Sequence, residues 1–165
     1  MTISLVGMTG AGKTTVGTAL AERLCADFID LDSEIEKKTG RPIPEIFELF
    51  GEEAFRQAET AQLEAVLKNR EKALVLSCGG GIATREKNRE LLKKHSFVVW
   101  LVRPLGEILK NPEILARPPI LGDAQKYIRL SGEREPQYAA ACELKLEYCD
   151  TLEAVEKIIK IIGGT

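Results

Sequence analysis

The chain has 165 residues, 44% of them hydrophobic, and its 23 Lys and Arg residues nearly balance 25 Asp and Glu residues. This length suits a single domain with a core of its own. The net charge of −2 argues against nucleic-acid binding by charge, and no apolar run reaches the roughly 18 residues of a membrane span. The first residues lack the basic start of a signal peptide. We therefore expect a cytoplasmic protein with neither a membrane nor a nucleic acid as a partner.

Strands and helices are expected to alternate along the chain. Short apolar runs predict strands at 2–6, 28–30, 73–76, 97–102 and 144–148. Helical spacing or composition predicts helices at 16–24, 43–50, 52–68, 84–94 and 152–162, and one more that ends near 142. The proline-containing stretch 111–122 shows no periodicity and is predicted to be a loop. This alternation favours an α/β fold: a five-stranded parallel sheet in a three-layer α/β/α arrangement, with ligands at the carboxyl ends of its strands.

The cysteines are predicted to be free thiols. Four of them, Cys25, Cys78, Cys142 and Cys149, form no CxxC pair, and the single histidine, His95, is distant from all four in sequence. A chain of this length can form a core without disulfides. We expect reduced, mostly buried thiols and no structural zinc site.

A glycine-rich segment follows the first predicted strand. Residues 7–14, Gly-Met-Thr-Gly-Ala-Gly-Lys-Thr, match the pattern G-x-x-x-x-G-K-[ST] at every fixed position. In such a loop, backbone N–H groups turn toward phosphate oxygens, the lysine bridges the β- and γ-phosphates, and the hydroxyl ligates Mg²⁺. A glycine turn without a ligand is the alternative, but the flanking strand and helix favour an ATP or GTP site. We assign the nucleotide to Gly10, Ala11, Gly12, Lys13, Thr14 and Thr15.

Two carboxylates, Asp30 and Asp32, follow the second predicted strand. One of them can hold the water shell of a metal ion while the other orients an acceptor hydroxyl. Capping is the alternative use of this segment, because Asp32 or Ser33 precedes a helical run at 34–38. The two interpretations remain open from the sequence.

Two further features point to an anionic acceptor. Arg56 and Glu59 are three residues apart on a predicted helix, so the carboxylate can hold the guanidinium toward an anion. A surface ion pair of little energetic weight is the other interpretation. Three consecutive glycines, Gly79, Gly80 and Gly81, end a buried strand. Because successive glycines cost conformational entropy, they indicate a backbone that approaches a ligand closely.

Together these features resemble the shikimate kinase family, small kinases with the P-loop NTPase fold. The loop is common to many kinases, whereas the combination of aspartates, arginines and glycine triplet is far more specific. The resemblance implies a single kinase domain over 1–165, with an acceptor-binding segment at about 31–60 and a lid at about 111–124. The matching segments are 7–15, 30–32, 36–43, 50–52, 55–59, 79–81, 117–118 and 134–138.

The implied reaction is Mg²⁺-dependent transfer of the γ-phosphoryl group of ATP to the 3-hydroxyl of shikimate, in the route to aromatic amino acids. Lys13 would act on the phosphates, and Arg117 would come down onto them from the lid. Asp30 and Thr14 would hold the Mg²⁺ ion with its water shell, with Ser77 close by.

On the acceptor side, the resemblance implies that Asp32 contacts the shikimate hydroxyls and assists removal of the proton from the attacking one. Arg56 and Arg134 would bind the carboxylate, and the backbone of 79–81 would close the pocket. The implied partners are shikimate and ATP, and we expect a monomer.

Three positions depart from the family pattern. Pro119-Ile120 replace the two leucines that usually follow Arg117-Pro118, which predicts a stiffer lid. Lys110 stands where an arginine commonly stacks on adenine, and lysine is the poorer stacker. The loop before the last helix is shortened to Cys149-Asp150-Thr151. Lys110 and Arg117 are thus expected at the nucleotide, but the adenine contacts and the preference for ATP stay open.

Two other functions also stay open at this point. A related small kinase acting on gluconate or another polyol acid would share the phosphate loop, although the glycine triplet with Arg56 and Arg134 speaks against it. A nucleotide-binding switch would need no acceptor residues at all.

Overall fold

The computed structural model describes residues 1–68, 72–117 and 120–163. Five strands form one sheet in the order β2-β3-β1-β4-β5, and every neighbouring pair is parallel. The predicted five-stranded parallel sheet is therefore confirmed. The strands are β1 (Thr2–Val6), β2 (Asp27–Asp30), β3 (Leu74–Ser77), β4 (Phe97–Val102) and β5 (Leu144–Glu147).

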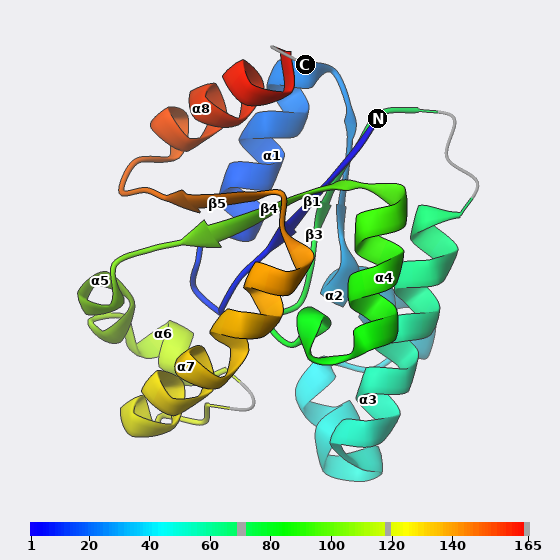
Figure 1. Cartoon of the computed structure of the whole chain (residues 1–165). Coiled ribbons are helices and arrows are strands. Elements are labelled where there is room, and N and C mark those ends of the chain that lie inside the picture. The colour runs from blue at the N-terminus through cyan, green and yellow to red at the C-terminus, as the bar shows by residue number, and fades with distance from the viewer. Residues whose placement is uncertain (69–71, 118–119, 164–165) are drawn as a thin grey trace.

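Helices cover both faces of the sheet, as the apolar strands require (Figure 1). Along β4, Val98 and Trp100 pack into one core cluster, whereas Val99 and Leu101 pack into the other. This alternation explains why the strand is apolar throughout, since both faces are buried. One face carries α1 (Lys13–Leu24) and α8 (Thr151–Gly163); the other carries α3 (Ile43–Leu67), α4 (Glu86–His95) and α7 (Ala124–Ala141). The remaining helices are α2 (Leu31–Thr39), α5 (Leu105–Leu109), α6 (Pro112–Leu115) and the 3₁₀ turn η1 (Ile82–Thr84).

The two helices predicted at 43–50 and 52–68 follow one another directly within α3, with a kink between them. The kink lies at Gly51, whose φ of 79° and ψ of 172° fall outside the helical region. Glycine adopts this conformation without steric cost, so the chain changes direction there while the helix resumes at once. The bend separates a short first part of α3 from the part that carries Arg56 and Glu59.

The loop prediction for 111–122 was wrong at 112–115, which form α6. The Asn111 side chain caps this helix by accepting hydrogen bonds from the backbone N–H groups of Glu113 and Ile114. A four-residue helix is too short to show hydrophobic periodicity, which is why the sequence did not reveal it. The stiffer lid was predicted from Pro119-Ile120, and Pro119 lies outside the described residues, as does Pro118.

All four cysteines are free thiols, as predicted, but the expectation that most of them are buried was wrong. Cys78 is buried beside the glycine triplet, Cys142 is half-buried, and Cys25 and Cys149 are exposed. Within the described residues, no helix is both long and apolar enough to cross a membrane.

Candidate active site

The glycine-rich loop connects β1 to α1 at the carboxyl end of the sheet. Gly10 and Gly12 have φ angles of 84° and 80°, in the region where only glycine is unstrained. The Lys13 ammonium donates to the carbonyls of Gly7 and Met8, each at 2.9 Å, and so spans the loop from inside. Helix α1 begins without a side-chain cap and without an acidic residue in its first turn. Its first N–H groups are therefore available to an anion.

Lys13 is buried, with carboxylates close to its ammonium group. Burial lowers the pKa of its ammonium to about 8, and the nearby carboxylate of Asp32 opposes that shift. Arg117 lies close enough to lower the same pKa further. The segment before Arg117 also reaches the loop, because a Cβ built on Gly10 would lie 2.6 Å from Cγ2 of Ile114 in α6. The predicted lid thus lies against the phosphate loop.

Asp30 joins the phosphate loop to α2. Its Oδ2 accepts a hydrogen bond from the Thr14 hydroxyl at 2.9 Å, and its Oδ1 accepts one from the backbone N–H of Ser33 at 3.3 Å. Asp30 is therefore the N-cap of α2, and the expectation that Asp32 or Ser33 fills that role was wrong. Capping takes up one carboxylate oxygen and leaves the other at Thr14, so the cap does not exclude the predicted role of Asp30 at a metal ion.

The chemistry of Thr14 and Asp30 suits a magnesium ion. A hydroxyl and a carboxylate are hard oxygen donors of the kind that Mg²⁺ accepts. Among the described residues, no group of three or more His, Cys, Asp or Glu side chains could hold a metal ion by itself. A magnesium ion at Thr14 and Asp30 would need phosphate oxygens and water to complete its coordination, as is usual for nucleotide sites.

A second set of polar groups surrounds the glycine triplet. The Arg56 guanidinium donates from Nη1 to Oε2 of Glu59 at 2.8 Å and also pairs with Glu52 at 3.3 Å. Glu59 is 0% exposed and Arg56 is 6% exposed. The interpretation of Arg56 and Glu59 as a surface pair was therefore wrong: the pair is buried, and losing one partner would strand a charge.

Two carboxylate oxygens in this region have no hydrogen-bond partner within the described structure. They are Oδ1 of Asp32 and Oε1 of Glu59, both buried. A Cβ built on Gly79 would lie 2.7 Å from the first and 2.8 Å from the second, so both oxygens converge on this glycine. Buried acceptors of this kind are normally satisfied, which calls for hydroxyl donors from a ligand.

The electrostatic environment of Asp32 favours a weakly acidic carboxyl group. Burial raises its pKa to about 6, and repulsion by Glu59 and Asp30 adds to that shift. Lys13 and Arg56 act in the opposite direction. Asp32 therefore changes protonation near neutral pH, where a group that accepts a proton is most useful.

Arg134 closes the other side of the cavity from α7. Its Nη1 donates to the Gly80 carbonyl at 3.1 Å, and it is 5% exposed. Arg56, Asp32, Thr9 and the glycine triplet line the same cavity as Arg134. Two guanidinium groups, a titratable carboxylate and a close backbone thus meet beside the phosphate loop.

The predicted site residues differ in how closely they gather. The phosphate loop, the two aspartates, the glycine triplet and the two buried arginines lie together at the carboxyl edge of the sheet. Lys110 lies at the end of α5, where its ammonium pairs with Glu107 at 3.4 Å and its side chain is 77% exposed. Its contact with a nucleotide stays a prediction.

No site role was predicted for two tyrosines of α7, although Tyr138 ends the matching segment 134–138. Tyr127 donates its hydroxyl to the Thr9 carbonyl at 2.9 Å, and the Tyr138 hydroxyl donates to the Gly80 carbonyl. They precede and follow Arg134 by seven and four residues, a spacing that places all three on one face of a helix. That spacing was the available signal, but it has meaning only once Arg134 is known to face the site.

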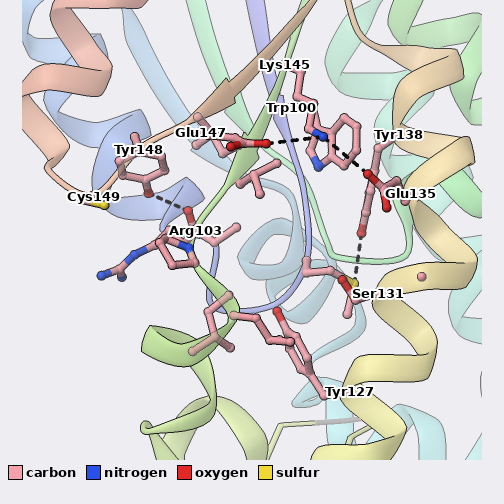
Figure 2. Close-up of a pocket in the computed structure, with 18 of the residues that line it drawn as sticks. Trp100, Arg103, Tyr127, Ser131, Glu135, Tyr138, Lys145, Glu147, Tyr148 and Cys149 are labelled. Atoms are coloured by element: carbon pink, nitrogen blue, oxygen red, sulfur yellow. Dashed lines mark hydrogen bonds and ion pairs between the residues drawn. The ribbon is translucent and has the colours of Figure 1, made fainter.

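A larger cavity of about 600 Å³ lies between α5, α7 and the ends of β4 and β5 (Figure 2). Within it the Lys145 ammonium lies 4.5 Å from the centre of the Trp100 ring and pairs with Glu135 at 3.4 Å and Glu147 at 3.5 Å. Tyr148, at one end of this cavity, donates its hydroxyl to the Ala11 carbonyl of the phosphate loop at 2.6 Å.

Sequence comparison with known proteins points to the shikimate kinase family. The family model described as shikimate kinase matches residues 9–162. A shikimate kinase of Acinetobacter baumannii (strain AYE) is 41% identical over 165 residues, covering 97% of this chain and 91% of that protein. One of Clostridium beijerinckii is 38% identical over 136 residues, covering 82% of this chain and 79% of that protein.

Solved structures agree with the sequence comparison. A shikimate kinase from Acinetobacter baumannii in complex with shikimate has a TM-score of 0.92 at 40% identity, covering 99% of this chain and 93% of that one. The shikimate kinase of Aquifex aeolicus has a TM-score of 0.86 at 30% identity, with coverage of 99% and 97%. A gluconokinase from Sinorhizobium meliloti, at 18% identity and a TM-score of 0.59, shares the fold alone.

Proposed function

Because the chain belongs to the shikimate kinase family, we propose that it transfers the γ-phosphoryl group of ATP to the 3-hydroxyl of shikimate. The observation that carries this proposal is the cavity beside the phosphate loop, where Arg56, Arg134 and Asp32 face one another. Shikimate has one carboxylate and three hydroxyls, which match two guanidinium groups and a carboxylate. The related Acinetobacter baumannii structure, which is a complex with shikimate, supports the same acceptor.

The two buried arginines would bind the substrate carboxylate. A guanidinium presents its N–H groups as a rigid fork that matches a carboxylate, and Glu59 fixes the orientation of Arg56. Arg134 is fixed in turn by the Gly80 carbonyl. The backbone of 79–81 lets the substrate ring approach closely, since no side chain stands there.

Asp32 would receive the proton of the attacking hydroxyl. It is the titratable carboxylate beside both the acceptor cavity and Lys13. Arginine stays protonated and cannot act as the base. The unpartnered oxygens of Asp32 and Glu59 would accept hydrogen bonds from the substrate hydroxyls. Phosphoryl transfer gains most of its rate from such alignment and from charge neutralisation.

The nucleotide side would use the loop and the first turn of α1. The N–H groups of 10–15 would hold the phosphates, with Lys13 neutralising the β- and γ-oxygens. Thr14 and Asp30 would hold a Mg²⁺ ion, which supplies charge neutralisation at the transferred group when it is bound. Lys110 would contact the nucleotide from the end of α5.

The lid would exclude water from the reaction. We assign it to about 111–124, with Arg117 approaching the phosphates, and the acceptor-binding segment to about 31–60, within a single kinase domain over 1–165. Water would otherwise compete as the acceptor of the phosphoryl group. The contact of Ile114 with Gly10 supports this assignment, because it brings α6 onto the loop.

The protein would act as a monomer in the cytoplasm. Every residue assigned to the two substrates comes from one chain, so no second copy is needed to complete the site. Free thiols agree with a reducing compartment.

Gly81→Ala is expected to raise the KM for shikimate by about tenfold or more, with a smaller change in kcat. The added methyl group would overlap the Arg56 guanidinium, which must then move away from its position beside Glu59. A 1 Å misplacement of a positioning group is enough for a large loss. Steady-state kinetics with ADP detection measure the effect.

Gly132→Ala serves as its matched control, because a Cβ built there meets nothing within 4 Å. This exposed helix position should gain slightly in stability from the change. An unchanged KM for shikimate in Gly81→Ala would contradict the assigned position of Arg56.

The pH dependence of kcat/KM for ATP should be bell-shaped. Asp32 must be ionised to accept a proton, so activity should fall below about pH 6, its raised pKa. Lys13 must be protonated to neutralise phosphates, so activity should also fall above about pH 8. Bound phosphates favour the charged ammonium, so in kcat the alkaline limb should move to higher pH. A profile that stays flat from about pH 5 to 9 would count against both roles.

The acceptor is tested by measuring ADP release with shikimate, gluconate and other hydroxy acids in turn. Shikimate should stimulate ADP release far more than any polyol acid. Stimulation by gluconate equal to that by shikimate would favour a polyol-acid kinase instead. Tight ATP binding without stimulation by any acid would favour a nucleotide-binding switch.

A further inference from the structure

Helix α7 presents one buried face to both substrate sites. Tyr127, Arg134 and Tyr138 lie on that face and are 1%, 5% and 1% exposed. The helix starts at Ala124, where the proposed lid ends. Seven residues separate Tyr127 from Arg134, which is about 10 Å along a helix at 1.5 Å per residue. Helix α7 therefore carries both the acceptor-binding Arg134 and Tyr127, which lies about two turns away.

Tyr127 contacts the phosphate loop at Thr9. Its hydroxyl donates to the Thr9 carbonyl at 2.9 Å, across 118 positions of sequence. Arg134 and Tyr138 instead donate to the Gly80 carbonyl in the acceptor cavity. Helix α7 is thus hydrogen-bonded to the nucleotide side at one end and to the acceptor side at the other.

Thr9 and Gly80 also contact each other directly. A Cβ built on Gly80 would lie 3.1 Å from the Thr9 hydroxyl oxygen and 3.2 Å from the Thr9 nitrogen. Thr9 lines the acceptor cavity while belonging to the phosphate loop. If α7 shifts when Arg134 binds a carboxylate, the hydrogen bond from Tyr127 moves Thr9 with the helix.

We propose that Tyr127 is a positioning residue that couples the two substrate sites. This inference rests on the proposed function, since it takes shikimate and the nucleotide as the two ligands. When a carboxylate binds Arg134, the Tyr127 hydroxyl holds Thr9, and with it the loop, in the arrangement that phosphates require. Coupling of this kind is reciprocal, so a bound nucleotide must tighten shikimate binding by the same factor.

The Tyr127 hydroxyl is suited to a fixed link. Burial raises the pKa of this phenol to about 12, so it remains a hydrogen-bond donor over the working range of pH. The aromatic ring has only two side-chain torsions and is packed in the core. A movement of α7 at Tyr127 therefore moves Thr9 by a similar distance.

Tyr148 provides a matched comparison within the same loop. Its hydroxyl donates to the Ala11 carbonyl at 2.6 Å, so it makes the same kind of bond to the phosphate loop. Tyr148 directly follows β5, an element that carries none of the residues assigned to the acceptor. Figure 2 shows Tyr127 and Tyr148 on different sides of the larger cavity. Removing the Tyr148 hydroxyl removes a hydrogen bond to the phosphate loop. It leaves intact the connection from the loop through Tyr127 and α7 to Arg134.

The test is the ratio of the shikimate dissociation constants without and with saturating ADP and Mg²⁺, measured by titration calorimetry. In the wild-type chain we expect a ratio of about 5 or more. In Tyr127→Phe the ratio should fall to within about twofold of one. Tyr148→Phe should bind ADP more weakly and yet keep the wild-type ratio. A purely structural role for Tyr127 would weaken each ligand but leave the ratio unchanged.

Thermal unfolding of each variant establishes that it is folded. Tyr127→Leu, a second variant without the hydroxyl, should lose the ratio in the same way, and the ratio measured from the ADP side should agree. A wild-type ratio near one overturns the inference. So does a Tyr127→Phe ratio equal to the wild-type ratio, and so does a ratio that falls equally in Tyr127→Phe and Tyr148→Phe. Those outcomes leave the proposed function intact, whereas a wild-type chain that binds no shikimate overturns the function itself.

Discussion

Replacing Lys13 by methionine is expected to lower kcat by about 10²- to 10³-fold. The ammonium lies at the centre of the phosphate loop, where it donates to the Gly7 and Met8 carbonyls. Methionine has a similar length but cannot neutralise the charge that develops on the transferred phosphoryl group. The loss should appear mainly in kcat, because the interaction is strongest in the transition state. ADP-release kinetics at saturating substrates measure it.

Lys157→Met provides the matched control for this substitution. Lys157 is an exposed lysine of α8 that pairs with Glu153 at 2.5 Å, on the face of the sheet opposite the acceptor cavity. Its replacement should leave kcat within about twofold, as expected of a surface pair. If Lys13→Met retained more than about a tenth of the wild-type kcat, the assignment of the ammonium to the phosphates would be wrong.

Asp32→Asn is expected to lower kcat by about 10²- to 10³-fold, which is the usual range for a group that takes a proton in the transition state. The amide keeps the size of the side chain and can still contact a hydroxyl, but it cannot accept the proton. Glu34→Gln tests the same chemical change on the exposed side of α2, where Glu34 pairs with Lys37. That variant should keep nearly full activity.

The same Asp32→Asn substitution should stabilise the fold at pH 8. In the folded chain the pKa of Asp32 is raised to about 6 from 3.8. The neutral carboxyl is thus favoured by folding below about pH 4, and that contribution is lost as the pH rises through about 6. Asparagine does not carry the buried charge, so its Tm should be a few degrees higher at pH 8. Lower activity with higher stability is the mark of a residue kept for function; a Tm that falls while kcat is unchanged would contradict the role of Asp32.

The sequence predicted the architecture and the phosphate loop because their signals are local. Apolar runs on both faces of a strand and the spacing of Gly7, Gly12 and Lys13 need no knowledge of tertiary contacts. The short helix α6 escaped prediction, since four residues cannot show a helical period. The break at Gly51 was predicted, because the helical runs 43–50 and 52–68 meet there, but the direction that the chain takes after this glycine depends on tertiary packing.

The acceptor cavity could be predicted only in part. Arg56 and Glu59 stand three residues apart on one helix, but their burial depends on how α3 packs against the sheet and η1. Asp30 serves as both cap and partner of Thr14, a combination that requires the end of β2 to lie beside the first turn of α1. The Tyr127–Thr9 hydrogen bond joins segments that are 118 positions apart, and no local sequence pattern predicts it.

The central claim is that phosphate moves from ATP to shikimate and not to water, and ³¹P NMR of the reaction tests it most directly. With ATP, Mg²⁺ and shikimate, we predict one new phosphomonoester signal that grows in step with ADP, with the phosphorus coupled to the proton on carbon 3 of the ring. Without shikimate, ADP should form only slowly. If inorganic phosphate were the product in both samples, at equal rates, the chain would be a hydrolase and the account would be wrong.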